Sequence, residues 1–400
     1  MLWQALTLQL GYNASLVAIG AALLGAAAGM TGTFPFLRKR ALVSDAVSHA
    51  TLPGLALAFI VMASFGGDGR GFLGLLAGSA LSAALGLLVV HWLTTRTRLT
   101  EDAAIGAVLS VFFGFGIVLL TVIQTMSTGR QAGLDSLLLG STAGMLFQDA
   151  ALIALAGLAT LVAVLVMRRP MIMTAFDPDF AATAGVNTAR TDLLTMGLVL
   201  AVTVIGLKIV GLILVVALLI IPPVAARFWT DRTDHLAAIA ALIGGVSGYV
   251  GSVISATAPA LPTGPIIVLV AFALFVLSFF FAPARGLAAG ALRQMVFRKR
   301  VHRRQGLLAL AQGQPIFEAL TRRILVREGY MRSDGVATEA GRARAARALR
   351  DEKRWEVVRA SEALAGEAAQ YDALTEIQEV LTPDQLAEVD RAIGAPMEVR

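Results

Sequence analysis

Two residues with metal-binding side chains, Asp45 and His49, lie inside a long apolar stretch, "LVSDAVSHATLPGLALAFI" at residues 42–60. If this stretch is a helix, the i, i+4 spacing places the carboxylate and the imidazole on one face, where they can bind one ion together. An imidazole nitrogen with a carboxylate oxygen suits borderline divalent metals such as Zn²⁺, Mn²⁺ or Fe²⁺. Pro53 and Gly54, one turn further on, predict a kink that frees backbone carbonyls beside the pair.

Two other interpretations of this pair stay open. Asp45 and His49 could bond to each other or to a neighbouring helix, since buried polar side chains also hold helices together in membranes. They could instead relay protons, a second use of Asp and His within a membrane. An ionised carboxylate in hydrocarbon costs at least about 2.5 kcal/mol, so we favour a role in handling a metal or another ion.

The composition is that of an integral membrane protein. Of the 400 residues, 57% are hydrophobic and 15% are charged, with a mean hydropathy of +0.75, whereas a soluble domain has about 25% charged residues. Apolar runs of about 20 residues are long enough to span a bilayer. We expect about nine such helices, near residues 14–34, 44–63, 72–92, 104–125, 150–167, 192–207, 209–226, 236–256 and 265–282. The absence of cysteine excludes disulfides, Cys-ligated zinc and iron–sulfur clusters.

The basic residues in the short loops predict the orientation. With nine spans and the N-terminus outside, ten basic residues fall in inner loops and three in outer loops, as the positive-inside rule requires. The inner ten are Arg38, Lys39, Arg40, Arg96, Arg98, Arg168, Arg169, Arg190, Arg227 and Arg232, and the outer three are Arg70, Arg130 and Lys208. His49 then lies about 13 Å above Arg40, near the middle of a hydrocarbon core about 30 Å thick.

The chain divides by composition into three parts. We predict a transmembrane domain at 1–285, a basic juxtamembrane linker at 286–305 and a cytoplasmic domain at 306–400. The part after residue 284 holds 20 of the 33 basic residues, beginning with the cluster "FRKRVHRR". This cluster also predicts contact with anionic lipid.

One inner loop, "RRPMIMTAFDPDFAATAGVNTARTDLL" at 168–194, is long and polar. Within it Asp177 can cap a short helix, Pro178 can take its first position, and Gly185 can end it. A capped helix with an exposed Phe180 is suited to docking into a cleft on a partner. An ordinary amphipathic connector is the alternative.

No nucleotide-binding or catalytic motif is present. A phosphate-binding loop needs Gly-Lys followed by Ser or Thr, and none of the four lysines (39, 208, 299 and 353) follows a glycine. We therefore expect no enzymatic activity, and any ATPase that drives transport is a separate chain.

Four segments in order resemble the permease subunit of the metal-uptake ABC transporters, which import zinc, manganese or iron. They are "FLRKRALVSDAVSHATLPGLALAF", "TEDAAIGAVLSVFFGFGIVLL", "AFDPDFAATAGV" and "KIVGLILVVALLIIPPVAARFW", and the resemblance covers roughly residues 15–285. It implies a helical bundle that dimerises around a translocation path, an extracytoplasmic metal-binding protein on the outside, and an ATPase dimer on the inside.

The same resemblance implies roles for particular residues. Asp45 and His49 correspond to the family's residues for metal passage. The segment that couples the permease to the ATPase corresponds to Phe176, Asp177, Pro178, Asp179, Phe180 and Gly185. The transported metal is the substrate, and no permanently bound cofactor is implied.

Residues 306–360 resemble the winged-helix domain of iron-dependent metalloregulators, with a short hairpin at Asp334–Gly335 followed by a long basic helix. The tail has one histidine, His302, and no cysteine, so the regulators' metal site is not recognisable. Basic helices also suit DNA, but the arginines alternate with acids, so a regulatory or assembly domain that contacts the ATPase is favoured over DNA binding.

The fold expected is therefore an all-α polytopic membrane protein with a small cytoplasmic winged-helix (α+β) domain. Its function is that of an ABC importer permease for a divalent metal in the bacterial inner (plasma) membrane. A proton-coupled secondary transporter and a membrane-tethered metal-responsive regulator remain alternatives, and a cobalamin or siderophore permease is a rival within the same class. The sequence leaves open which metal is carried and whether the dimer is homo- or heteromeric.

Overall fold

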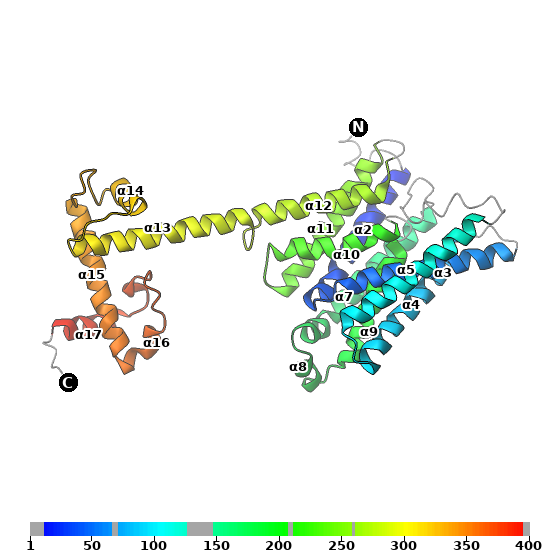
Figure 1. Ribbon diagram of the computed structural model, residues 1–400, viewed down its shortest axis with the longest axis horizontal. Coiled ribbons are helices and arrows are strands. Elements are labelled where there is room, and N and C mark those ends of the chain that lie inside the picture. The colour runs from blue at the N-terminus through cyan, green and yellow to red at the C-terminus, as the bar shows by residue number, and fades with distance from the viewer. Residues whose placement is uncertain (1–11, 66–70, 126–146, 207–210, 258–260, 395–400) are drawn as a thin grey trace. The chain divides into compact units, whose positions relative to one another are not determined.

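The computed structural model describes residues 12–65, 71–125, 147–206, 211–257 and 261–394, and this part of the chain is nearly all helical (Figure 1). The first helices are α2 (Tyr12–Leu37), α3 (Leu42–Ser64), α4 (Phe72–Arg96), α5 (Glu101–Thr125), α7 (Phe147–Phe176), α8 (Pro178–Thr183) and α9 (Thr188–Gly206). They are followed by α10 (Leu212–Arg227), α11 (Thr233–Ser255), α12 (Thr263–Phe281), α13 (Leu287–Ala311), α14 (Ala319–Arg327) and α15 (Glu339–Ala360). The last are η2 (Glu362–Leu364), α16 (Ala365–Ala368), η3 (Ile377–Glu379) and α17 (Pro383–Gly394).

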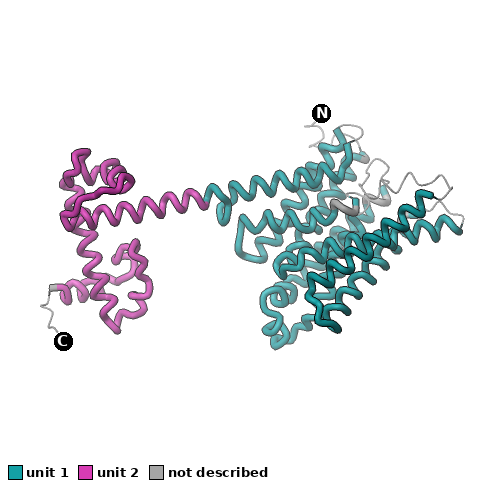
Figure 2. Tube along the Cα trace, viewed as in Figure 1, with its two compact units in different colours: residues 1–289 teal, residues 290–400 magenta. Residues whose placement is uncertain are grey.

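The chain forms two compact units, one of residues 1–289 and one of residues 290–400 (Figure 2). The first unit contains all the long apolar helices. The second contains most of α13 and the charged helices that follow it.

Eight of the described helices in the first unit are long and apolar enough to cross a membrane: α2, α3, α4, α5, α7, α9, α11 and α12. The ninth predicted span, at 209–226, corresponds to α10, which has only 16 residues. At 1.5 Å per residue it rises about 24 Å, less than the thickness of the hydrocarbon core. The three basic residues predicted for outer loops, Arg70, Arg130 and Lys208, lie outside the described residues.

The helix α2 packs most extensively against α11 and also contacts α7 and α10. Glycines bring the backbones of α2 and α11 together: a Cβ added at Gly25 would overlap the carbonyl oxygen of Gly244, and the reverse holds for a Cβ at Gly244. Close approach through small residues is the usual way in which membrane helices gain van der Waals contact. This seam has no room for side chains.

A second group of helices is formed by α3, α4 and α5, which pack against one another. Here a Cβ added at Gly54 would overlap the carbonyl oxygen of Gly78 on α4. Gly54 therefore serves the close packing of α3 on α4. The helix α9 contacts α7 and α2 of the first group and α3 and α4 of this one.

The second unit has two small apolar cores. One contains Trp355, Val358 and Ile377, and the other contains Leu307, Leu325 and Met331. Both lie between helices and short connecting segments.

The predicted α+β winged-helix domain is not supported, because the described residues contain no β-strand. Their β structure is one isolated antiparallel bridge, Met331–Ala337. The turn predicted at Asp334–Gly335 is present, and Gly335 has the positive φ of 92° that such a turn needs. However, α14 ends at Arg327 and α15 begins at Glu339, so each arm of the hairpin has too few residues for a sheet.

Candidate functional site

The predicted pair lies on the first half of α3. His49 Nε2 is 3.3 Å from Asp45 Oδ1, so the i, i+4 spacing does bring the two side chains together. Two atoms bonded to one metal ion at about 2.1 Å, at an angle of about 90–110°, lie about 3.0–3.4 Å apart. The pair therefore has the separation that two ligands of one ion require.

The imidazole of His49 is held by a neighbouring helix. Its ring packs edge-on against Phe113 of α5, with ring centroids 4.9 Å apart and an interplanar angle of 81°. Its Nδ1 atom is buried and has no hydrogen-bond partner. A buried unpaired ring nitrogen is unusual in a purely structural histidine.

The described residues contain no group of three or more His, Cys, Asp or Glu side chains that could hold a metal ion. The pair is thus a two-ligand site in a single chain. The nitrogen of Pro53 carries no hydrogen, so the carbonyl of His49 lacks its usual helical partner. The helix α3 nevertheless continues unbroken from Leu42 to Ser64.

Both side chains reach the surface of the single chain, with 34% of the Asp45 side chain and 19% of the His49 side chain exposed. A carboxylate that faced lipid at this depth would be costly. Beside the pair, α5 exposes Phe113 and two glycines, Gly106 and Gly114, at which an added Cβ would meet nothing. The open side of the pair therefore adjoins a surface of small and aromatic residues.

An ion-pair cluster that sequence reasoning missed joins the start of α3 to two other helices. Arg38 pairs with Asp192 of α9, and Arg40 Nη1 lies 3.3 Å from the Asp192 carboxylate. Arg40 Nε lies 2.8 Å from Glu101 Oε2 of α5. Asp192 is about 150 positions away from its partners, so no local sequence pattern could have revealed this cluster.

A cavity of about 600 Å³ lies against this cluster, between the ends of α3, α4, α5 and α9. Arg40, Glu101 and Asp192 line it together with His91 and Arg190. Asp45 and His49 are not part of its wall. The cavity therefore lies at the charged end of the bundle, for which the positive-inside rule predicts the inner surface.

The short helix predicted after Asp177 is present as α8. The Asp177 carboxylate accepts a hydrogen bond of 2.9 Å from the Phe180 N–H, and Pro178 takes the first position. After the helix, Gly185 has a φ of 84°, and the Val186 N–H donates to the Ala181 carbonyl at 2.9 Å. Local capping alone explains why this loop folds into a helix.

The aromatic residues of this segment point outward. The exposed fractions are 60% for Phe180 and 65% for Phe176, whereas Ala181 is fully buried against the bundle. Asp179 is also exposed. The segment is therefore anchored through one face and presents two phenyl rings on its free surface.

These features define a polytopic helical membrane protein with an Asp–His pair inside one helix and a capped helix on a polar loop. The chain belongs to the ABC 3 transport family, whose sequence profile matches residues 12–282. It is accordingly the membrane permease subunit of an ABC transporter, and the family predicted from the four motifs is confirmed.

Curated relatives with three different cargoes are similar to this chain. The manganese transport system membrane protein MntC of Bacillus subtilis is 42% identical over 77% of this chain and 70% of its own length. The zinc transport system membrane protein TroC of Treponema pallidum is 39% identical over 72% and 94%. The chelated iron transport system membrane protein YfeC of Yersinia pestis is 30% identical over 72% and 93%.

A solved structure supports the fold. PsaBC from Streptococcus pneumoniae, in complex with Fab, aligns with a TM-score of 0.61 and 27% identity, over 71% of this chain and 98% of the matched chain. A putative metal-chelate type ABC transporter in an inward-facing conformation aligns with a TM-score of 0.54. At 18% identity, the latter likeness concerns the fold alone.

Proposed function

We propose that this protein is the permease of an ATP-driven importer for a divalent metal ion, manganese, zinc or iron, and that the ion passes Asp45 and His49. The observation that carries this proposal is the 3.3 Å contact between His49 Nε2 and Asp45 Oδ1 within a membrane helix. The names of the manganese, zinc and iron relatives support the class of cargo.

The site is suited to passage rather than storage. Two side-chain ligands bind a divalent ion more weakly than the three or four ligands of a resident metal site. Weak binding allows the ion to leave, as conduction through a membrane path requires. The partly exposed carboxylate of Asp45 favours a second permease, identical or homologous, against α5, which would bring a second pair close to the path.

The partners follow from the two ends of the bundle. The proposed orientation in the bacterial inner membrane, which the positive-inside rule favours, has the N-terminus outside and residues 290–400 in the cytoplasm, and it requires α10 to cross the membrane as a ninth span. The helix α8 docks on a separate ATPase dimer through Phe176 and Phe180, with Asp177, Pro178, Asp179 and Gly185 maintaining its shape. An extracytoplasmic metal-binding protein delivers the ion to the opposite end.

The test replaces one ligand at a time, Asp45→Asn and His49→Ala, and measures uptake of Mn²⁺, Zn²⁺ and Fe²⁺ in cells. We expect both variants to lose uptake while they still insert into the membrane and co-purify with the ATPase. Matched controls are Asp102→Asn and His235→Ala, which change exposed residues of the same types. Normal uptake of all three metals by both site variants would refute the proposed path.

A further inference from the structure

The helix α13 of the second unit carries arginines and apolar residues on one face. Arg293, Val296, Phe297, Arg300 and Arg304 follow one another at intervals of one to four residues that return to the same side of a helix. Leu292, Val296 and Phe297 are all exposed. This face therefore combines positive charge with apolar surface.

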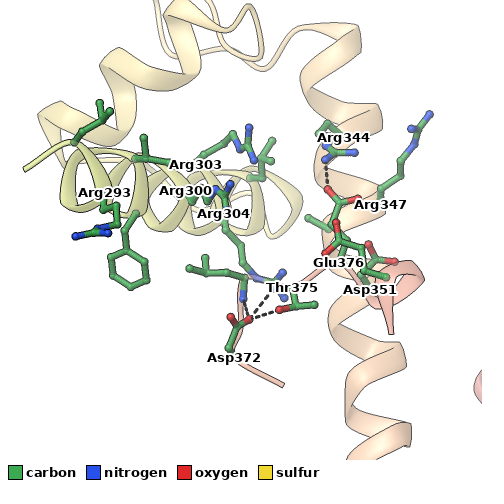
Figure 3. Close-up of a pocket in the computed structure, with 17 residues that line it drawn as sticks. Arg293, Arg300, Arg303, Arg304, Arg344, Arg347, Asp351, Asp372, Thr375 and Glu376 are labelled. Carbon is green, nitrogen blue, oxygen red and sulfur yellow. Dashed lines mark hydrogen bonds and ion pairs between the residues drawn. The ribbon is translucent and has the colours of Figure 1, made fainter. Parts of the chain in front are cut away.

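The face forms one wall of a cavity of about 690 Å³ within the second unit, between α13, α15 and the segment 372–379. Figure 3 shows its arginines along α13 and on α15. Six arginines line it: Arg293, Arg300, Arg303, Arg304, Arg344 and Arg347. A volume of this size is typical of a small-molecule site.

Two of these arginines are neutralised within the protein. Arg304 Nη2 lies 2.6 Å from Glu352 Oε2, and Arg344 Nη2 lies 2.5 Å from Glu376 Oε1. By contrast, Arg300, Arg303 and Arg347 have no hydrogen-bond or ion-pair partner among the residues that the structure describes. The positive charges of three guanidinium groups on this wall are therefore not neutralised by an ion pair among the described residues.

Fewer carboxylates than arginines line the cavity: Asp351, Asp372, Glu376 and Glu379 stand against the six arginines. Asp372 accepts hydrogen bonds from the Leu374 and Thr375 N–H groups and from the Thr375 hydroxyl, and these bonds lower the pKa of its carboxyl. Asp351 pairs with Arg354 at 3.0 Å, which leaves Glu379 as the one lining carboxylate without such a bond in the described part of the chain. The cavity therefore keeps an excess of positive charge.

Guanidinium groups match the oxygens of a phosphate group, which accepts paired hydrogen bonds from several arginines at once. The exposed Phe297 and Val296 beside them suit an apolar group next to that phosphate. We propose that this cavity binds the phosphate group of a ligand that also carries an apolar part. Two sources have this chemistry, a free nucleotide and the headgroup of an anionic phospholipid.

The experiment uses the full-length permease, purified without its ATPase, in nanodiscs of phosphatidylcholine. One arm measures binding of ADP by calorimetry, and the other measures retention of added phosphatidylglycerol by native mass spectrometry. The test variant is Arg300→Gln/Arg303→Gln/Arg347→Gln. Its control, Arg323→Gln/Arg327→Gln/Arg342→Gln, removes the same charge at exposed positions that do not line the cavity.

We expect the test variant to lose binding by about a hundredfold or more, since each charge-assisted contact contributes about tenfold to affinity, and the control variant to bind like the parent. Loss in the ADP arm identifies a soluble phosphate ligand, and loss in the phosphatidylglycerol arm identifies a lipid headgroup. If neither arm separates the test variant from the control, the proposal is wrong.

Discussion

Replacing Phe180 by alanine removes the largest exposed side chain of α8, and the structure sets the size of the effect. A phenylalanine that becomes fully buried covers roughly 200 Å², and Phe180 is 60% exposed in the single chain. Docking would therefore bury roughly 120 Å² more, which corresponds to about 3 kcal/mol at about 25 cal/mol per Å². Because alanine keeps the Cβ, we expect a loss of about 2 kcal/mol, or about thirtyfold in affinity for the ATPase.

The assay is co-purification of the ATPase with tagged permease at several ATPase concentrations, together with metal uptake in the same cells. Uptake should fall although Asp45 and His49 are unchanged. The matched control is Phe317→Ala, because Phe317 is an even more exposed phenylalanine, at 90%, in the second unit. If Phe180→Ala leaves both co-purification and uptake at the level of this control, α8 is not the docking surface.

Three further outcomes test the packing and the division of the chain. Gly244→Ala should lower the melting temperature of the first unit by several degrees, because the new Cβ would overlap a carbonyl oxygen of α2. The control, Gly106→Ala, should leave the melting temperature unchanged in the same thermal scan, because its added Cβ meets nothing. Asp390→Asn should destabilise α17 by about 1 kcal/mol at neutral pH, as measured by hydrogen exchange. The hydrogen bonds from Arg354 lower the pKa of the Asp390 carboxyl. The effect is small because the Asp390 side chain is partly exposed. In the parent protein this contribution is present above the ordinary carboxyl pKa and disappears as the pH falls through the lowered value, so a pH-independent difference between the two proteins would contradict it. Deleting residues 290–400 should leave a permease that still inserts and runs as a single species in detergent, and an aggregated product would show that the units are not separable.

The features that sequence reasoning predicted correctly are those with a local physical cause. An apolar run of about 20 residues has few alternatives to a membrane helix, and eight helices long enough to span were found near predicted positions. The helix α8 is specified by Asp177, Pro178 and Gly185 within nine residues. The contact between Asp45 and His49 follows from their spacing on one helix.

The features that were missed depend on contacts between distant segments. The ion pairs of Arg38 and Arg40 with Asp192 join residues of α9 to the turn before α3, and nothing near Asp192 in the sequence indicates its partners. The contact of Gly25 with Gly244 is of the same kind, since nothing in the sequence around either glycine indicates that the two helices meet there.

The winged-helix prediction failed for a different reason. The Asp334–Gly335 turn was identified correctly, but a turn determines only that the chain reverses. Whether its two arms pair depends on their length, and here Gly329 and the cap of α15 at Thr338 limit both arms. One bridge forms where a sheet was expected.

The position of α9 has a mechanical consequence for transport. The backbones of α2 and α11 are in direct contact at Gly25 and Gly244, so these two helices form a close-packed pair. The helices α3, α4 and α5 form the other group, and α9 contacts both groups. Since α8 begins two residues after α7 ends and α9 begins five residues after α8 ends, a displacement of α8 by the ATPase would act on both α7 and α9. We therefore expect α9 to transmit such a displacement to the group of helices α3, α4 and α5, which carries His49, while α2 and α11 move little.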